Sequence, residues 1–298
     1  MDIYTDFAAV YDTFMDETPY DVWGDFIAEL IDKYGVSKPV SDQEVPGCRS
    51  NDMQDVCNSD CTFDGEANEN PDIEYEDAIA EEKNLIVELG CGTGSFTQVM
   101  KRKGYDIMGT DISPEMLNIA RHKAADSELD IMYLEQDMRE LDLYCTAGTI
   151  ISVCDSVNYL LEDDDVIETF KLVNNFLFPG GIFIFDFNTL HKYRDIIGDT
   201  TIAENREDCS FIWDNYYHEE EHINEYDLTI YARCSKDDEI FRRSVETHYQ
   251  RGYTLEEMCD FVKAAGLELV TTIDADTHEQ PTSESERIYI VAREKGKV

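Results

Sequence analysis

A short apolar run that ends in three closely spaced glycines constrains this fold more than any other stretch. Residues 85–89 read Leu-Ile-Val-Glu-Leu, and glycines follow at Gly90, Gly92 and Gly94. Such a run is typical of a strand buried on both faces of a parallel sheet. Because glycine carries no Cβ, a ligand can approach this turn closely, and unpaired N–H groups at the start of the next helix can donate to it. The turn therefore predicts a nucleotide-like ligand at the end of a buried strand.

The rest of the chain repeats this alternation of strand and helix. Apolar runs predict six further strands, at 105–110, 131–134, 149–154, 182–187, 267–273 and 288–292. Helical periodicity between the first five strands indicates right-handed crossovers and a largely parallel sheet with helices on both faces. The expected fold class is therefore α/β, a Rossmann-like, doubly wound, mostly parallel sheet of seven strands.

The pattern changes after residue 200. Apolar residues alternate with polar ones from Tyr226 to Ala232 and again over 241–250, which predicts antiparallel strands that cover the ligand crevice as a lid. We therefore expect five regions: an N-terminal helical cap at 1–37, an acidic flexible insertion at 38–83, the cofactor-binding core at 84–190, the antiparallel β lid at 191–253, and a C-terminal helix and strands at 254–298.

Charge narrows the classes of partner. The chain carries 66 Asp and Glu against 24 Lys and Arg, a formal net charge of −42. A field of that sign repels phosphate backbones and anionic membranes, so neither nucleic acid nor a membrane is expected as a direct partner. The chain lacks an apolar run of membrane-spanning length, and its N-terminus lacks the features of a secretory signal, so a cytoplasmic location is expected.

The nine cysteines do not follow a disulfide spacing, and reduced thiols are the simpler interpretation. Cys48, Cys57 and Cys61 lie close together but form no Cys-x-x-Cys pair. Structural zinc sites usually contain such a pair, so no metal is expected.

Ligands of doubly wound sheets bind at the carboxyl ends of the strands. That rule gathers the glycine turn, Asp111, Asp137 and Asp155 around one crevice. Two cofactor classes remain open on this ground alone, because an acid that ends the second strand can bind ribose hydroxyls in either class. The spacing Gly-x-Gly-x-Gly differs from the dinucleotide fingerprint Gly-x-Gly-x-x-Gly, which disfavours an NAD(P)-dependent oxidoreductase.

The order of motifs carries a stronger signal. Four segments, taken in order, resemble the successive motifs of class I S-adenosylmethionine-dependent methyltransferases. They are Glu88-Leu-Gly-Cys-Gly-Thr-Gly94, Gly109-Thr-Asp-Ile-Ser-Pro-Glu-Met116, Gln136-Asp-Met138 and Pro179-Gly-Gly181. The chain resembles the small-molecule branch of this class, the branch similar to methyltransferase domain 25. The opening helix of that branch is similar to the N-terminal segment Tyr4-Thr-Asp-Phe-Ala-Ala-Val-Tyr-Asp12. Asp155-Ser-Val-Asn-Tyr-Leu160 and Phe185-Asp-Phe-Asn-Thr189 resemble that branch as well.

The resemblance implies S-adenosyl-L-methionine as cofactor and gives the matching residues expected roles. Glu88, Gly90, Cys91, Gly92 and Gly94 would border the methionine portion, and Asp111 would bind the ribose hydroxyls. Ile112 and Met116 would pack on the adenine, and Asp137 and Met138 would address its edge. Cys154 and Asp155 would lie near the sulfonium, with Tyr11 closing over them.

Purely structural roles remain open for several of these residues. Gly94 could serve only the close packing of helix on strand, and Met116 could serve only the core. Asp111 could be a turn residue, and Asp137 could be an acid of a surface loop.

The implied reaction is methyl transfer to a nitrogen or oxygen nucleophile of a small molecule, achieved mainly by proximity and orientation. No catalytic base can be chosen from the sequence; the candidates in the predicted lid are His218, His248 and Tyr249. The negative charge of the protein favours an amine acceptor. An NAD(P)-dependent oxidoreductase and a catalytically silent S-adenosylmethionine-binding protein remain the alternatives.

Overall fold

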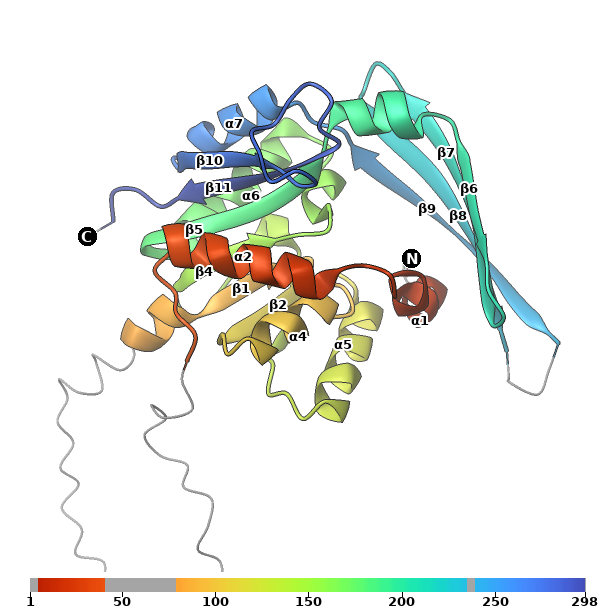
Figure 1. Cartoon of the computed structure of the whole chain (residues 1–298), viewed down its shortest axis with the longest axis horizontal. Coiled ribbons are helices and arrows are strands. Elements are labelled where there is room, and N and C mark those ends of the chain that lie inside the picture. Colours follow the sequence, from red (N-terminus) through yellow and green to blue (C-terminus); the bar gives the residue numbers. More distant parts are fainter. Residues whose placement is uncertain (1–4, 41–78, 235–238, 298) are drawn as a thin grey trace, which may run out of the picture.

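The computed structural model of the chain describes residues 5–40, 79–234 and 239–297 (Figure 1). The predicted acidic insertion at 38–83 falls largely in the gap at 41–78 and so lies outside the described residues, as do Cys48, Cys57 and Cys61. Among the helices that are described, none combines the length and the apolarity needed to cross a bilayer.

A seven-stranded sheet forms the centre of the molecule, with strand order β10-β11-β5-β4-β1-β2-β3. The strands are β1 Ile86–Leu89, β2 Ile107–Asp111, β3 Tyr133–Glu135, β4 Ala147–Ser152, β5 Leu177–Asn188, β10 Glu268–Asp274 and β11 Arg287–Arg293. The first five run parallel, and β11 pairs antiparallel with both β5 and β10. Because β1, β2 and β4 are buried along their whole length, their sequences are mostly apolar or small and lack the alternation of a half-exposed strand. The predicted fold class is confirmed.

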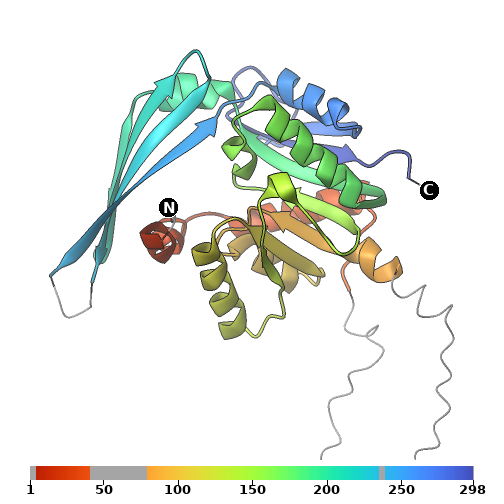
Figure 2. The same ribbon diagram turned by 180° about the vertical axis from the view of Figure 1, so that it is seen from behind.

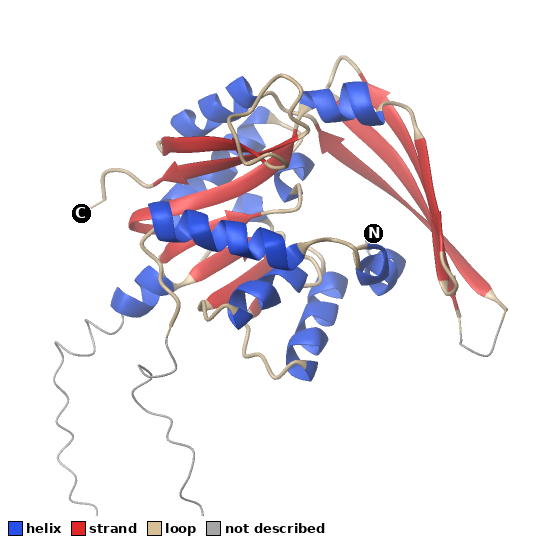
Figure 3. Ribbon diagram, viewed as in Figure 1, coloured by secondary structure: helices blue, strands red, loops and turns tan. Residues whose placement is uncertain are grey.

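Helices cover both faces of this sheet (Figure 3). Helix α1 Thr5–Phe14 lies beside the lid, and α2 Tyr20–Tyr34, α4 Ser95–Arg102, α5 Pro114–Asp126, α6 Asp163–Phe176 and α7 Leu255–Ala264 lie around the sheet. The short turns are η1 Met138–Glu140, η2 Ser156–Tyr159 and the π-helical η3 Lys192–Ile197. Helices α6 and α7 pack on one face through Phe170 and Met258, and α2 and α4 pack on the other through Ile31 and Met100. Two apolar cores, one on each side, therefore hold the sheet rigid.

Local sequence explains where the helices begin. The Ser113 side chain accepts a hydrogen bond from the N–H of Met116, with proline at the first helical position of α5. At α7 the sequence Thr254-Leu-Glu-Glu257 has the spacing of a capping box, and the side chains of Thr254 and Glu257 form the two reciprocal hydrogen bonds.

The second sheet is antiparallel and has the order β6-β7-β8-β9. Its strands are β6 Thr201–Asn205, β7 Cys209–His218, β8 Ile223–Arg233 and β9 Phe241–Arg251. In both views of the whole chain this sheet arches away from the core beside the carboxyl ends of the parallel strands, and α1 lies beneath the arch (Figures 1 and 2). Helix α1 contacts both β8 of the lid and α5 of the core. The predicted antiparallel lid insertion is confirmed.

Candidate active site

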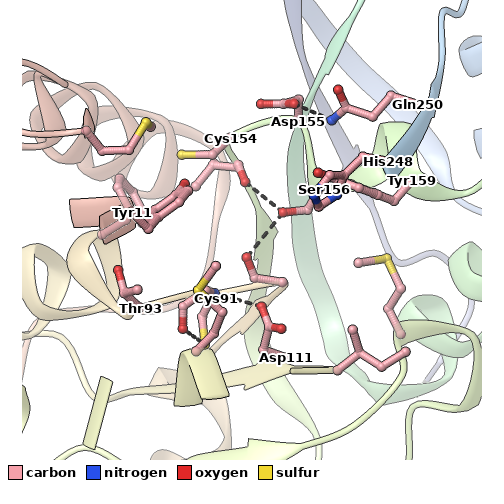
Figure 4. A pocket seen from close by; sticks show the side chains of 18 of the residues that line it. Tyr11, Cys91, Thr93, Asp111, Cys154, Asp155, Ser156, Tyr159, His248 and Gln250 are labelled. Carbon is pink, nitrogen blue, oxygen red and sulfur yellow. Dashed lines mark hydrogen bonds between the residues drawn. The ribbon is translucent and has the colours of Figure 1, made fainter. Parts of the chain in front are cut away.

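A cavity of about 660 Å³ lies between the carboxyl ends of β1, β2 and β4, helix α1 and the concave face of the lid (Figure 4). The structure brings most of the predicted site residues to its wall: Tyr11, Glu88, Gly90, Cys91, Gly92, Asp111, Ile112, Met116, Asp137, Met138, Cys154 and Asp155. Gly94 is not part of this wall. The topology therefore gathers residues that are up to 144 positions apart, counting from Tyr11 to Asp155, around one space.

The three glycines of the turn all have positive φ, between 54° and 71°. A Cβ on Gly92 would have no neighbour within 4 Å, so this residue exposes bare backbone to the cavity. A Cβ on Gly94 would lie 2.4 Å from the Tyr133 hydroxyl, and one on Gly90 would lie 2.6 Å from Oγ of Ser156. Gly94 therefore serves close packing, which was one of its two predicted roles, while Gly92 leaves room for a ligand.

Asp111 joins the end of β2 to the glycine turn. Its Oδ2 accepts the Gly92 N–H at 2.7 Å, and its Oδ1 accepts the Ser113 N–H at 2.9 Å. Burial raises the pKa of this carboxyl, and the backbone donors oppose that shift. Because a carboxylate has about four acceptor sites, Asp111 retains lone pairs for hydroxyl groups of a ligand.

Glu88 lies at the floor of the cavity and is 2% exposed. The hydroxyl of Thr97 donates to its Oε2 at 2.5 Å. Burial raises the pKa of Glu88 to about 8, and the nearby Asp111 charge adds to this effect. Burial also raises the pKa values of the Cys91 and Cys154 thiols, which keeps both of them protonated and weakly nucleophilic.

Asp137 is held by an arginine that the sequence reasoning missed. Its Oδ2 lies 2.6 Å from Nη2 of Arg139, and its Oδ1 accepts the Arg139 N–H at the start of η1. The Arg139 guanidinium lowers the pKa of this carboxyl. Arg139 also reaches Asp165 at 3.4 Å. The signal was its position two residues after Asp137, a spacing that allows a side chain to fold back on a turn.

Cys154 and Asp155 form a left-handed turn after β4, with φ of 61° and 55°. Both backbone N–H groups donate to the buried Asp186 carboxylate, at 3.2 and 2.8 Å. Non-glycine residues rarely adopt this conformation, so the buried acceptor stabilises it. Asp186 was also missed as a site residue; the signal was a single acid inside the apolar β5. Arg287 lies 3.7 Å from Asp186 and balances its charge.

The side chain of Asp155 is directed toward the lid, where Nε2 of Gln250 in β9 donates to its Oδ2 at 2.6 Å (Figure 4). Burial raises the pKa of Asp155 to about 6, while Lys192 lowers it and Asp186 raises it further. This carboxyl therefore titrates close to neutral pH.

Helices α1 and α2 each place one phenol near this turn. Tyr11 and Tyr20 both line the cavity, and burial raises the pKa of each, with the neighbouring Cys154 adding to the shift. Trp23, a third aromatic of the predicted cap, lies away from the cavity and instead packs on Arg287, whose guanidinium carbon is 4.3 Å from the Trp23 ring centroid.

An aromatic wall lines the lid side of the cavity: Trp213, Tyr226 and His248 come from the lid, and Tyr159 comes from η2 of the core. The hydroxyls of Tyr159 and Tyr226 are 2.9 Å apart, and the rings of Tyr226 and His248 stack at 4.9 Å. The Trp213 ring lies edge-on to Tyr226 at 5.2 Å. Sequence reasoning named only His248 of this wall, because the alternation of β8 and β9 does not show which face is turned to the core.

The three candidate catalytic residues separate clearly. His248 lines the cavity and is 3% exposed. Tyr249, the next residue in β9, also contributes to the cavity wall, but its hydroxyl lies 3.4 Å from Glu225, on the face of the strand opposite to His248. His218 binds the same Glu225 at 2.7 Å and is not part of the cavity wall. Within the described residues, no three His, Cys, Asp or Glu side chains converge as a metal site requires.

Comparison with known proteins gives a consistent result. Residues 86–181 match the family model described as "Methyltransferase domain". The chain is 30% identical over 292 residues to YqeM of Bacillus subtilis (strain 168), a protein provisionally named a methyltransferase, covering 98% of this chain and 97% of that one.

Two solved structures share the fold. An S-adenosylmethionine-dependent methyltransferase from Clostridium acetobutylicum ATCC 824 superposes with a TM-score of 0.74 at 23% identity, covering 98% of this chain and 99% of the other. The sugar N-methyltransferase KedS8 from Streptoalloteichus sp ATCC 53650 superposes with a TM-score of 0.57 at 16% identity, covering 81% of this chain and 100% of the other.

Proposed function

The chain belongs to the class I S-adenosylmethionine-dependent methyltransferases, and from this premise we propose that it methylates a nitrogen or oxygen nucleophile of a small molecule. The relationship extends over nearly the whole of YqeM and so includes the lid as well as the core. The predicted class of enzyme and its cofactor are thereby confirmed. An NAD(P)-dependent oxidoreductase, which the glycine spacing disfavours, loses its remaining support.

The residues at the core side of the cavity fit this cofactor. Gly92 leaves open space where a side chain would stand, and the Asp111 carboxylate keeps acceptor sites beside it. We infer that the glycine turn, Glu88 and Cys91 hold the methionine portion, Asp111 the ribose, and Ile112, Met116, Asp137 and Met138 the adenine. Cys154 and Tyr11 border the reactive end. When bound there, S-adenosylmethionine supplies a methyl group already activated by the positive sulfur.

The chain's own residues then have mainly to exclude water and align the acceptor. Helix α1 and the lid both contribute to the cavity wall, so an acceptor inside it would lie beside the cofactor residues. Such alignment contributes a large part of a bimolecular barrier, with effective molarities reaching about 10⁵ M or more. A strong base at the reacting atom is unnecessary for an amine that is already neutral.

The observation that carries the small-molecule proposal is the continuity of one cavity from the glycine turn to the aromatic wall of the lid. Small-molecule sites commonly have volumes of about 300–1,000 Å³ and mostly apolar walls. The net charge of −42 opposes a nucleic-acid acceptor. A fold shared with a sugar N-methyltransferase supports the same class of acceptor.

The first test compares thermal stability with S-adenosylmethionine, S-adenosylhomocysteine, NAD and NADP. A ligand at about 100 times its Kd adds about 2.7 kcal/mol to the free energy of unfolding. We expect stabilisation by the two adenosyl compounds alone. The loaded enzyme is then offered mixed small amines and alcohols, an RNA pool and a protein pool, and methylated products are detected by mass spectrometry. Methylation confined to RNA or protein would reject the proposal.

A further inference from the structure

Asp155 occupies the boundary between the cofactor side of the cavity and the lid, and its carboxylate is directed to the lid (Figure 4). We propose that Asp155 belongs to the acceptor site: it binds the ammonium group of an amine acceptor against the aromatic wall and takes a proton from it. This inference rests on the proposed function and narrows it from nitrogen or oxygen nucleophiles to amines. It also moves Asp155 from the cofactor role that the family resemblance implies.

A chain of hydrogen bonds fixes which atom faces Asp155. Nζ of Lys192 donates to Oδ1 of Asn188 at 2.9 Å, which leaves the Asn188 amide N–H to donate to the Tyr193 hydroxyl at 3.0 Å. The Tyr193 hydroxyl then donates to Oε1 of Gln250 at 3.0 Å. Gln250 can therefore present only its N–H group to Asp155, at 2.6 Å.

This polarity has a consequence for Asp155. A hydrogen bond from an N–H donor stabilises the ionised form of a carboxyl group more than its protonated form. Asn188, Tyr193 and Gln250 are all buried, so water does not compete for these bonds. One donor leaves most of the acceptor sites of the Asp155 carboxylate open to a ligand. The network therefore favours an ionised Asp155 carboxylate at the lid side of the cavity.

The aromatic wall suits a cation beside that charge. Gln250 and His248 lie two residues apart on the same face of β9, so the wall begins directly beside the residue that holds Asp155. Tyr226, stacked on His248, and Tyr159, edge-on to it at 6.1 Å, line the same space. Aromatic faces attract ammonium groups, most strongly where water is excluded.

The charges along the wall disfavour an acidic acceptor. Five acids line the cavity; burial keeps Glu88 mostly protonated near neutral pH, and the other four are Asp111, Asp137, Asp155 and Glu204. Among the Lys and Arg residues that the structure describes, Arg139 alone lines it, and its guanidinium is already bound to Asp137 and Asp165. A carboxylate or phosphate acceptor would enter without a free counter-charge.

The proposed step is a proton transfer that prepares the nucleophile. An acceptor R–NH₃⁺ bound to Asp155 gives one proton to the carboxylate and becomes R–NH₂ with a free lone pair. The amine lone pair forms the nitrogen–carbon bond as the carbon–sulfur bond of the methyl donor breaks, with the bonding pair remaining on sulfur. The product leaves as a methylammonium ion, and the Asp155 proton passes to solvent.

The test measures binding of matched probes to the full chain saturated with S-adenosylhomocysteine, by calorimetry at pH 7.5. The probes are cyclohexylamine, cyclohexanol and cyclohexanecarboxylate, which share one ring and differ in charge. We expect the amine to bind at least tenfold more tightly than the other two. Asp155→Asn should reduce amine affinity about tenfold or more, since a charge-assisted hydrogen bond contributes about 1.5–3 kcal/mol. Asparagine tolerates the left-handed backbone at this position.

Asp164→Asn is the control, because it removes the same charge from an exposed position of α6. It should leave amine affinity within twofold of the wild type. Equal binding of the carboxylate, failure of the amine to bind, or an unchanged amine affinity in Asp155→Asn would each overturn the inference. Binding of S-adenosylhomocysteine to both variants is measured separately; if the unmodified chain itself fails to bind it, the proposed function fails first.

Discussion

The Asp12 carboxylate of α1 accepts a hydrogen bond from the Thr93 hydroxyl of the glycine turn, with 2.6 Å between the oxygens. Nζ of Lys123 in α5 donates to the other Asp12 oxygen at 2.7 Å and to the Ser95 hydroxyl at the same distance. One acid thus joins the N-terminal helix to the cofactor turn and to α5. Because Tyr11 is the adjacent residue, this contact also sets the position of a phenol in the cavity wall.

Replacing Asp12 should loosen this closure. We expect Asp12→Ala to speed the dissociation of S-adenosylhomocysteine about tenfold, equivalent to about 1.4 kcal/mol, because α1 loses its hydrogen bond to the turn and its ion pair with Lys123. Stopped-flow displacement of the ligand measures the rate. Asp32→Ala is the control: it removes a carboxylate of α2 from an exposed ion pair with Lys38 and should leave the dissociation rate unchanged. Equal rates for Asp12→Ala and the wild type would show that α1 does not retain the cofactor.

Two glycines of the same turn should respond differently to alanine. Gly92→Ala meets no protein atom but enters a left-handed conformation, so we expect a loss of stability of about 1–2 kcal/mol and a larger loss of S-adenosylhomocysteine affinity. Gly94→Ala drives a methyl group into Tyr133 and should destabilise the fold more strongly. Urea unfolding and calorimetry compare the two. If the loss of S-adenosylhomocysteine affinity were proportional to the loss of stability in both variants, a ligand role for Gly92 would be contradicted.

Glu88 predicts a pH-dependent stability. Its pKa is about 8 in the folded chain and 4.5 for the free side chain, so the folded state holds the proton more tightly. Its contribution is therefore fully present below pH 4.5 and is lost as the pH rises to 8, at ~1.4 kcal/mol per unit of pKa difference. Glu88→Gln should gain stability relative to the wild type over this interval. Urea unfolding from pH 5 to 9 checks it; a constant difference between the two proteins would refute the raised pKa.

Asp186 should contribute to stability through the turn that it supports. Asp186→Asn offers an amide N–H where Cys154 and Asp155 both donate, and it leaves Arg287 without its counter-charge. We expect a loss of about 3 kcal/mol in the free energy of unfolding. Chemical denaturation measures it, with Asp164→Asn as the control for charge alone. A loss below that of the control would mean that the turn holds its shape without Asp186.

The proposed acceptor role of Asp155 has a pH dependence of definite sign. With a pKa of about 6, this carboxyl loses its charge as the pH falls through 6, so amine affinity should fall with it. The charged and titratable groups that face it are Cys154, Asp186, Arg287, Lys192, Tyr11 and Tyr193. Calorimetry from pH 5 to 8 should show this fall for the wild type and a flat profile for Asp155→Asn. A wild-type profile without the fall would contradict the proposal.

The sequence by itself determined the features that depend on neighbours along the chain. Short, mostly apolar runs predicted the buried strands, such as β1 and β4, because both faces of each strand are covered. The spacing of glycines predicted the ligand turn, and Thr254 with Glu257 predicted the start of α7. The parallel topology then brought Asp111, Asp137 and Asp155 to one edge of the sheet, since the carboxyl ends of parallel strands share it.

Only the tertiary structure decided how distant side chains meet. Asp155 and Gln250 are 95 residues apart, and Asp12 and Thr93 are 81 apart, so no local pattern predicts either contact. A strand alternates equally well with either face inward, so the predicted strands at 226–232 and 241–250 did not identify the aromatic wall. Trp213 and Tyr159 lie outside both of these predicted strands. Which face of the lid is buried depends on how it packs against α1 and the core. These contacts join residues that are distant in the sequence, so they form only when the chain folds.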